Sequence, residues 1–317
     1  EKRHGRFMKL NHMLSTKDFS RKQIDSILSL AEKFEPVALR EKRCNILDGK
    51  ILSLLFFEPS TRTKMSFETA MLRLGGKVID MGSIETSSVM KGESLADTVR
   101  VVSSYADSIV LRHPKEGAAF MASEFSTVPI INAGDGAGHH PTQTLLDLHT
   151  IRRESKLDGL TITLAGDLKY GRTVHSLCYA LSHYNARINL ASPPELVLPD
   201  RIIQDLKNRG IKVTKFDTLE NAVKDSDVLY MTRIQRERFP DPAEYNKVSK
   251  EMRVTLKLLE NCKPDMKVMH PLPRVDEIEP EVDKTPHACY FKQAFYGIPV
   301  RMAVLVMAME EKYGKVL

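Results

Sequence analysis

The stretch ILSLLFFEPSTRTKMSFE, residues 51–68, joins an apolar run to a group of hydroxyl and basic side chains. The run at 51–57 is typical of a buried strand, and a helical pattern begins after Ser60. A polar turn alone would let the chain leave a sheet. Arg62 is an additional cation in a first helical turn whose dipole is already positive, which indicates a turn that binds an anion.

The same strand-then-helix pattern recurs along the chain. Strands alternating with helices form parallel sheets through right-handed βαβ connections, so the sequence predicts an α/β fold with two doubly wound parallel-sheet domains and an active-site cleft between the domains. The expected strands are apolar runs at 51–57, 78–81, 109–111, 128–132, 160–165, 187–190, 211–216, 228–231 and 267–269.

The predicted domain boundary lies near residue 150, at the end of a helix that starts at Pro141. The first domain is expected to cover 1–150 and the second to cover 151–317. A natural start at Met8 would make residues 1–7 an extension.

Prolines are expected to set the ends of two helices. An opening helix from Ser20 to Phe34 should stop at Pro36, because proline lacks the N–H that an interior turn requires. The final helix, at about 299–313, should begin at Pro299 and pack back on the first domain.

Composition limits the class of protein. The 317 residues are 42% hydrophobic and 28% charged, which is typical of a globular chain rather than a disordered one. The net charge of +6 is spread along the sequence without a block of Lys or Arg, so no nucleic-acid partner is expected, and small anionic substrates explain the bias.

Cysteine usage and hydropathy indicate a cytoplasmic protein. No disulfide framework or zinc site is expected from four scattered cysteines, Cys44, Cys178, Cys262 and Cys289. No apolar run is long enough to span a membrane, and a secretory signal pattern is missing. Neither a metal nor another cofactor is predicted.

Six polar motifs follow predicted strands. Ligands of open α/β sheets bind beyond the carboxyl ends of the strands, so three motifs in each half predict a substrate site. The motifs are Ser60–Thr63, Arg112–His113, Asp135–Gln143, GDLKYGR at 166–172, TRIQRERF at 232–239 and HPLPR at 270–274.

Each motif has a simpler alternative. Ser60 or Thr61 could only cap the next helix, but capping leaves Arg62 unexplained, so phosphate binding is favoured. His139 is interpreted as a loop-stabilising residue. His140, with Gln143 one turn later, is the better candidate for a donor to a carbonyl oxygen.

The motifs of the second half favour carboxylates over a dinucleotide. Gly166 and Gly171 do not have the G-x-G-x-x-G spacing of a nicotinamide cofactor site. Lys169 and Arg172 indicate a carboxylate-bearing substrate or an inter-domain ion pair. The charge run from Arg233 is either a solvated loop or a second anion site, and ETSSVMKGES at 85–94 is interpreted as a mobile loop with one cation.

Taken together, these motifs resemble the aspartate carbamoyltransferase family. FFEPSTRT, KGESLADT, LRHP, HPTQTLLDL, GDLKYGRTVHSL, YMTRIQ and MHPLPRVDEI occur in the family's order from about Leu14 to the final helix. The related ornithine enzymes share the STRT-type turn, but typically carry an HCLP motif where this chain has HPLP. An ornithine-type enzyme and a non-catalytic carbamoyltransferase-like subunit remain as alternatives, although Lys64 and the AGHH segment are the only departures noted.

The resemblance implies carbamoyl transfer from carbamoyl phosphate to the α-amino group of L-aspartate, an early step of pyrimidine biosynthesis. It implies that the first domain binds carbamoyl phosphate and the second binds aspartate. The implied catalytic residues are Arg62, Thr63, Lys91, Arg112 and His140, and the implied substrate-binding residues are Ser60, Thr61, Ser87, Gln143, Arg172, Arg233, Gln235, Leu272 and Pro273.

The resemblance also implies an assembly. Ser87 and Lys91 would enter the active site of a neighbouring subunit, so the catalytic unit would be a homotrimer, with regulatory chains as a further possible partner. Glu58, Arg172 and Arg238 would form an ion-pair set that steadies domain closure.

Overall fold

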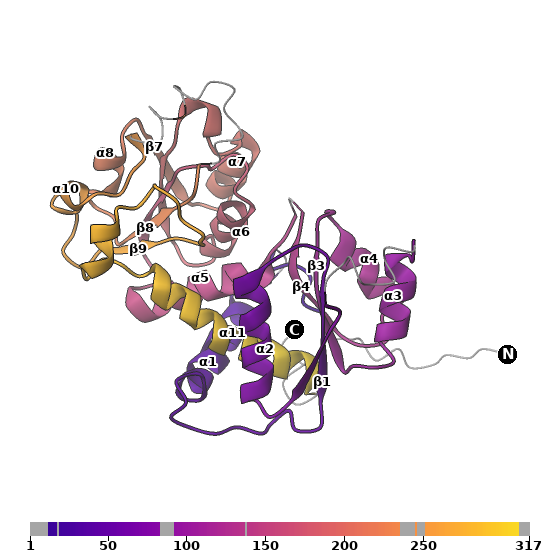
Figure 1. The fold of residues 1–317 in the computed structure, drawn as a ribbon. Helices are drawn as coiled ribbons and strands as arrows, with labels where there is room; N and C mark the ends of the chain where they lie inside the picture. The colour runs from indigo at the N-terminus through magenta and orange to yellow at the C-terminus, as the bar shows by residue number, and fades with distance from the viewer. Residues whose placement is uncertain are drawn as a thin grey trace. The chain divides into compact units, whose positions relative to one another are not determined.

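The computed structural model describes residues 12–17, 19–82, 92–136, 138–234, 245 and 251–310 (Figure 1). The chain divides into two units. The first unit comprises Glu1–Ser15, Lys22–Thr142 and Ile298–Leu317, and the second comprises Thr16–Arg21 and Gln143–Gly297.

The first unit is built on a parallel sheet with the strand order β2-β1-β3-β4. Its strands are β1 (Ile51–Phe56), β2 (Lys77–Asp80), β3 (Ser108–His113) and β4 (Ile130–Asp135). Its helices are α1 (Arg21–Ala38), α2 (Thr61–Arg73), α3 (Leu95–Val102) and α4 (Ala118–Phe125). Helix α2 covers one face of the sheet, and α3 and α4 cover the other (Figure 1).

Strand β1 is where the winding of this sheet reverses. The chain goes from β1 to β2 on one side and then returns to β3 on the other. Phe56, the last residue of β1, is the register partner of Arg112 in β3. Ligands of doubly wound sheets bind beyond the strands at such a reversal, so the ends of β1 and β3 are the expected position of a site.

The second unit has a five-stranded parallel sheet with the order β7-β6-β5-β8-β9. Its strands are β5 (Thr161–Ala165), β6 (Arg187–Ala191), β7 (Lys212–Phe216), β8 (Val228–Met231) and β9 (Lys267–Met269). Helices α6 (Arg172–Leu181) and α7 (Asp200–Asn208) lie on one face, with α8 (Leu219–Val223) and α10 (Leu256–Leu259) on the other (Figure 1). The winding reverses between β5 and β8.

Burial on both faces explains why the strands are apolar runs rather than alternating patterns. All four residues of β8 and all six of β4 are buried. Strands inside a parallel sheet lie between two helical layers, so their side chains are removed from water, whereas the edge strands β2 and β7 are mostly exposed or half-buried. The predicted α/β fold with two parallel-sheet domains is confirmed, and each of the nine predicted runs overlaps or adjoins a strand of the described residues.

The helix ends assigned to the two prolines were wrong. Helix α1 continues through Pro36 to Ala38, and α11 (Tyr290–Met309) begins nine positions before Pro299. A proline inside a helix removes one backbone hydrogen bond. In α11 the residues after Pro299 are deeply buried, with Val300, Met302 and Leu305 at 0% exposure, and this burial offsets the lost bond.

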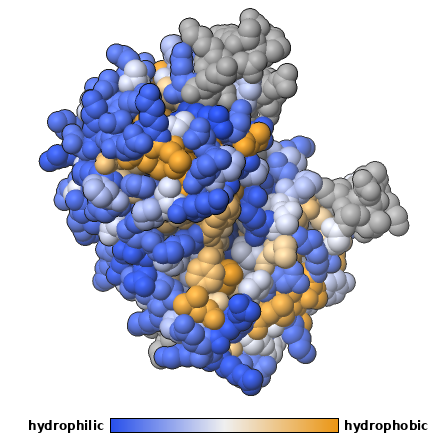
Figure 2. Space-filling view, turned by 60° about the vertical axis from the view of Figure 1, so that its left-hand side comes forward, coloured by the Kyte–Doolittle hydropathy of each residue, from blue (hydrophilic) through white to orange (hydrophobic). Residues whose placement is uncertain are grey.

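The surface drawn in Figure 2 is mainly hydrophilic, with hydrophobic residues gathered in a few patches. The exposed large hydrophobic side chains include Met65, Leu72 and Tyr105. Within the described residues, no helix has the length and apolar character that crossing a membrane requires.

The loops that follow β5 and β8 approach each other at Gly166. Its φ is +97°, and a Cβ built on it would lie 2.2 Å from the carbonyl oxygen of Thr232. That oxygen belongs to the backbone, so it cannot move aside as a flexible side chain would. Both the left-handed conformation and the close approach therefore require glycine here.

We predict that Gly166→Ala lowers the free energy of unfolding by about 3 kcal/mol, because backbone strain and overpacking add. Gly210→Ala is the matched control, since Gly210 has a φ of +79° but nothing within 4 Å of the added Cβ. The control should lose about 1 kcal/mol from strain alone. Urea denaturation measures both losses, and equal losses would contradict the close approach.

Candidate functional site

The turn after β1 does not use its serine as a cap. Ser60 occupies the N-cap position of α2, with extended backbone (φ −159°, ψ 98°), yet it makes no side-chain capping hydrogen bond in the described structure. By contrast, Ser94, Thr218 and Thr255 each accept a hydrogen bond from an N–H of the helix that they precede. The capping alternative therefore does not account for the Ser60 hydroxyl.

The first turn of α2 carries the remaining hydroxyls and Arg62. Thr63 is buried, at 8% exposure, whereas Thr61 and Arg62 are exposed. Partial loss of hydration and the positive charge of Arg112 both lower the pKa of Arg62. Two guanidinium groups that influence each other beside a helix N-terminus form a region of positive potential, and a bound anion would relieve it.

Arg112 is held at the end of β3. Its Nη1 donates to the carbonyl oxygen of Ala133 at 3.2 Å, and its Nη2 lies 3.2 Å from Oε2 of Glu58. The Arg112 side chain is 14% exposed, and its Nε is buried without a hydrogen bond to any described residue. A buried donor with no acceptor costs about 1–3 kcal/mol, which a ligand oxygen would recover.

Asp135 organises the loop that leads to His140. The Oδ1 of Asp135 accepts from the backbone N–H of His139 at 2.7 Å and from Nδ2 of Asn132 at 3.1 Å, while its Oδ2 accepts from Gly117 N at 2.9 Å. His140 follows at 6% exposure, directly before α5 (Pro141–Glu154). These contacts agree with the loop-stabilising interpretation of His139, whose Nδ1 also lies 3.3 Å from Ser15 Oγ.

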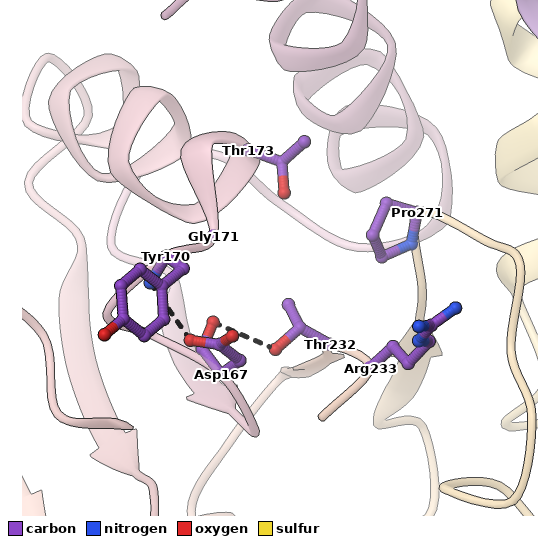
Figure 3. Close-up of a pocket in the computed structure, with 7 residues that line it drawn as sticks. All are labelled: Asp167, Tyr170, Gly171, Thr173, Thr232, Arg233 and Pro271. Atoms are coloured by element: carbon purple, nitrogen blue, oxygen red, sulfur yellow. Dashed lines mark hydrogen bonds between the residues drawn. The ribbon is translucent and has the colours of Figure 1, made fainter. Parts of the chain in front are cut away.

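The second unit contains a pocket at its own reversal point (Figure 3). Two groups of residues line it, one following β5 and one following β8, and Pro271 follows β9. The lining residues are Asp167, Tyr170, Gly171, Thr173, Thr232, Arg233 and Pro271. The pocket thus lies beyond the carboxyl ends of three strands, as the sheet topology predicts.

Hydrogen bonds fix the pocket wall. Oδ1 of Asp167 accepts from Tyr170 N at 3.0 Å, and the carbonyl oxygen of Asp167 accepts from Thr232 Oγ1 at 3.4 Å (Figure 3). Thr232 Oγ1 also donates to the carbonyl oxygen of Ala165 at 2.9 Å. Arg233 lines the pocket, and Arg172 is the first residue of α6, directly after the pocket residue Gly171. A carboxylate in this pocket would meet at least one guanidinium.

Gln143 belongs to a buried network centred on Asp147 of α5. Oδ1 of Asp147, which is 0% exposed, accepts from Nε2 of Gln143 at 2.9 Å and from Nε2 of Gln293 at 2.7 Å. Oδ2 of the same carboxylate accepts from the hydroxyl of Tyr230 at 2.8 Å. Burial and Asp147 raise the pKa of Tyr230, which keeps this hydroxyl a donor.

Leu272 and Pro273 continue from the pocket residue Pro271. Leu272 has a φ of +52°, and the Leu272–Pro273 peptide bond is cis. The backbone N–H of Leu272 donates to Nδ1 of His270 at 2.8 Å. Both residues therefore belong to a loop held from its buried side.

Several predicted residues lie outside the part of the chain that the structure describes. They are Ser87, Lys91, Gln235 and Arg238. The expected ion-pair set was Glu58, Arg172 and Arg238. In the first unit, Glu58 forms an ion pair with Arg112, which was not a member of that set.

Burial makes three of the four cysteines, Cys178, Cys262 and Cys289, unsuited to nucleophilic catalysis. All are free thiols, and burial raises the pKa of Cys178 to about 12 and of Cys262 to about 11. Thiols with such values are protonated near neutral pH. Among the described residues, no group of three or more His, Cys, Asp or Glu side chains could hold a metal ion.

Sequence reasoning missed the residues that support the site. Asp135, Asp147, His270, Glu277 and Gln293 are all buried. Asp135 and His270 are the first residues of two strand-end motifs, so their positions could have indicated that they support the site. Gln293 falls before Pro299, in a segment that was not expected to be helical.

Two family models match this chain. The aspartate/ornithine carbamoyltransferase carbamoyl-P binding domain matches residues 11–153, and the Asp/Orn binding domain matches residues 158–308. The curated aspartate carbamoyltransferase catalytic subunit of Methanococcoides burtonii is 65% identical over 298 residues, covering 94% of this chain and 97% of that protein.

Solved structures agree with these matches. The catalytic subunit of M. jannaschii aspartate transcarbamoylase is 56% identical with a TM-score of 0.92, covering 96% of this chain and all of that one. Aspartate transcarbamoylase from Trypanosoma cruzi, solved with carbamoyl phosphate and aspartate, is 40% identical with a TM-score of 0.86, covering 93% and 94% of the two chains. The resemblance inferred from the sequence motifs is confirmed.

Proposed function

This chain belongs to the aspartate/ornithine carbamoyltransferase family, and we propose that it transfers the carbamoyl group of carbamoyl phosphate to the α-amino group of L-aspartate. The products are N-carbamoyl-L-aspartate and phosphate, which places the enzyme early in pyrimidine biosynthesis. The relative solved with both carbamoyl phosphate and aspartate supports this substrate pair.

The observation that carries the proposal is the turn after β1. Its N-cap serine makes no capping bond, and its arginine lies close enough to Arg112 for the second cation to lower its pKa. Hydroxyls, helix N–H groups and a guanidinium at one helix terminus suit a phosphate. Ser60, Thr61 and Arg62 would therefore hold the phosphate of carbamoyl phosphate.

The carbamoyl group would be held at two ends. Thr63, Arg112 and His140 are assigned as donors to its carbonyl oxygen, where negative charge develops, and each well-placed donor is worth about 3–4 kcal/mol. Gln143 and the backbone carbonyls of Leu272 and Pro273 are assigned to its amino group. The buried positions of Thr63 and His140 and the half-buried position of Arg112 support the first assignment, since donors out of water act more strongly.

Aspartate would occupy the pocket of the second unit. Arg233 lines that pocket and Arg172 begins the adjoining helix, so both can pair with carboxylates. Gln235 is a third proposed ligand. In this assignment the first domain, residues 1–150, binds carbamoyl phosphate and the second, residues 151–317, binds aspartate.

The proposed reaction is a direct displacement through a tetrahedral intermediate. The lone pair of the aspartate amine forms a bond to the carbamoyl carbon, and the carbonyl electrons move onto oxygen. When the carbonyl re-forms, the bond from carbon to the phosphate oxygen breaks, the phosphate leaves with that electron pair, and it takes up the proton that the nitrogen loses. No enzyme nucleophile takes part, so catalysis comes from positioning, worth up to about 7–11 kcal/mol, and from charge stabilisation.

We further propose that the active unit is a homotrimer. Ser87 and Lys91 would reach the active site of a neighbouring subunit, and regulatory chains could associate with such a trimer. An ornithine-type enzyme and a non-catalytic subunit are the competing functions. The strand-end arginines, including Arg112 and Arg233, favour catalysis over the second alternative.

We predict that the purified enzyme forms carbamoyl aspartate when it receives carbamoyl phosphate and L-aspartate. Replacing aspartate by ornithine should give no product, because Arg233 in the pocket wall and Arg172 at the start of the adjoining helix suit a second carboxylate rather than a second ammonium group. A colorimetric assay for carbamoyl amino acids distinguishes the two. Turnover of ornithine, or of neither substrate, would contradict the proposed function.

We also predict that Arg62→Ala lowers kcat/KM for carbamoyl phosphate about 100- to 1,000-fold, because the phosphate loses its cationic donor. The urea midpoint should change little, since Arg62 is exposed. Arg43→Ala removes the same charge from another exposed position in the first unit and should leave turnover unchanged. Near-normal turnover of Arg62→Ala would exclude the phosphate assignment.

A further inference from the structure

Leu272 has an unfavourable backbone conformation. Its φ of +52° lies in the left-handed region, which costs a residue with a Cβ about 1–2 kcal/mol. Such a residue keeps this conformation only where its surroundings hold it, and strained residues gather at functional sites. Leu272 directly follows the pocket residue Pro271, so the strain lies at the edge of the pocket.

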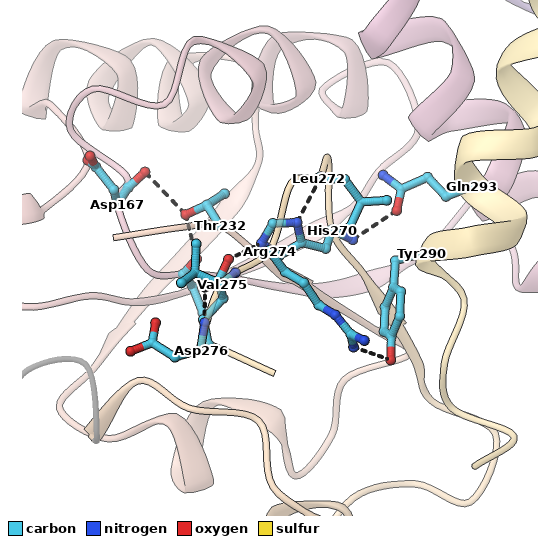
Figure 4. Close-up of polar contacts among 11 residues, drawn as sticks. Asp167, Thr232, His270, Leu272, Arg274, Val275, Asp276, Tyr290 and Gln293 are labelled. Atoms are coloured by element: carbon cyan, nitrogen blue, oxygen red, sulfur yellow. Dashed lines mark hydrogen bonds and ion pairs between the residues drawn. The ribbon is translucent and has the colours of Figure 1, made fainter. Parts of the chain in front are cut away.

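His270 holds the N–H of Leu272. The imidazole is 1% exposed, and its Nδ1 lies 2.8 Å from Leu272 N (Figure 4). A backbone N–H can only donate, so Nδ1 must be the acceptor and must carry no proton. The ring proton of the neutral imidazole therefore lies on Nε2.

Glu277 keeps the proton on Nε2. Its Oε1 lies 2.6 Å from Nε2 of His270, and its Oε2 accepts from the backbone N–H groups of Val275 at 3.0 Å and Asp276 at 3.1 Å. Burial tends to raise the pKa of Glu277, but the hydrogen bond from Nε2 of His270 and a backbone hydrogen bond from Val275 lower it overall. The ionised carboxylate is an acceptor on both oxygens, which selects the Nε2–H tautomer.

The other side of His270 is anchored to the network that holds Gln143. His270 N donates to Oε1 of Gln293 at 2.8 Å (Figure 4). Nε2 of Gln293 in turn donates to Asp147 at 2.7 Å. Asp147 also accepts from Gln143 at 2.9 Å. One continuous set of buried and partly buried hydrogen bonds thus reaches the Leu272 backbone and the Gln143 side chain, which are both assigned to the carbamoyl amino group.

We propose that His270 is a positioning residue for carbamoyl transfer. Its Nδ1 holds the backbone N–H of Leu272, and this keeps the backbone that follows in place, so that the carbonyls of Leu272 and Pro273 face the carbamoyl amino group. Glu277 fixes the imidazole tautomer in which Nδ1 can accept this hydrogen bond. The inference rests on the proposed function, because it assigns a support for two of its substrate-binding groups. His270 itself does not touch the substrate.

Two substitutions of His270 test its two contacts separately: the acceptor for Leu272 N and the contact with Glu277. In His270→Asn the amide oxygen can take the position of Nδ1 and accept from Leu272 N, but the reach to Glu277 is lost. In His270→Gln the amide can reach Glu277 from the position of Nε2, but no acceptor remains near Leu272 N. Each variant therefore keeps one of the two contacts of the imidazole.

The two variants should differ in kcat/KM for carbamoyl phosphate, but they should not differ in their binding of inorganic phosphate. His270→Gln should lower kcat/KM for carbamoyl phosphate about 10- to 100-fold, as expected for reacting groups displaced by about 1 Å. His270→Asn should stay within about fivefold of the wild type, since it keeps the acceptor for Leu272 N. Both should bind inorganic phosphate as the wild type does in calorimetry, because the residues that hold phosphate are Ser60–Arg62.

A general loss of packing would give a different pattern. It would weaken phosphate binding as well and would lower the urea midpoint of both variants together. If both His270 variants fail to fold, Glu277→Gln provides the test with less change in volume. In this variant the amide NH2, which is a donor, faces another donor: either the Nε2 proton of His270 or the backbone N–H groups of Val275 and Asp276. The imidazole tautomer is then no longer fixed, so Glu277→Gln should show the same kinetic loss as His270→Gln.

The inference is overturned if His270→Gln and His270→Asn have equal kcat/KM for carbamoyl phosphate, or if a folded Glu277→Gln enzyme has wild-type kinetics. The wild-type assay with carbamoyl phosphate and aspartate is run first. If the wild type shows no transfer, the proposed function fails and the inference fails with it. If the wild type is active and the variants do not differ, only the role of His270 is refuted.

Discussion

The parallel pairing of two strand pairs determines where chemistry can occur in this protein. In the first unit β1 pairs with β3, and in the second β5 pairs with β8. In both pairs the carboxyl ends lie at the same edge of the sheet, and in both the chain reverses its winding there. The sheet interiors are covered by helices, so the strand ends are the places where backbone N–H groups and charged side chains can meet a ligand.

The two strand ends have different chemistry. Beyond β1 and β3, a helix N-terminus, hydroxyls and two arginines that repel each other make up the proposed anion site. Beyond β5 and β8, the close approach of Gly166 to Thr232 shapes a pocket with Arg233 in its wall. Two anionic substrates need cations at both strand ends. This need explains why a chain with a net charge of only +6 places several arginines at strand ends.

Much of the fold could be predicted from the sequence because its signal is local. Apolar runs and the polar residues that follow them are read within about ten positions, and the strand-end motifs identified Arg112 and Arg233 in this way. The helix ends predicted at Pro36 and Pro299 were wrong because burial of the neighbouring residues, which no local pattern reports, offsets the backbone hydrogen bond that each proline removes. The supporting network was also out of reach: Asp147 is 83 positions from Tyr230 and 146 from Gln293, so only the folded chain brings their polar atoms together.

A crystal structure of the enzyme with carbamoyl phosphate would show whether the end of β1 binds phosphate. We expect phosphate oxygens within hydrogen-bond distance of Ser60, of the backbone N–H groups at the start of α2 and of the Arg62 guanidinium. The Arg112 side chain should then bond the carbonyl oxygen of the same ligand. A phosphate bound elsewhere on the chain, with Ser60 turned to cap its own helix, would exclude phosphate binding at this turn.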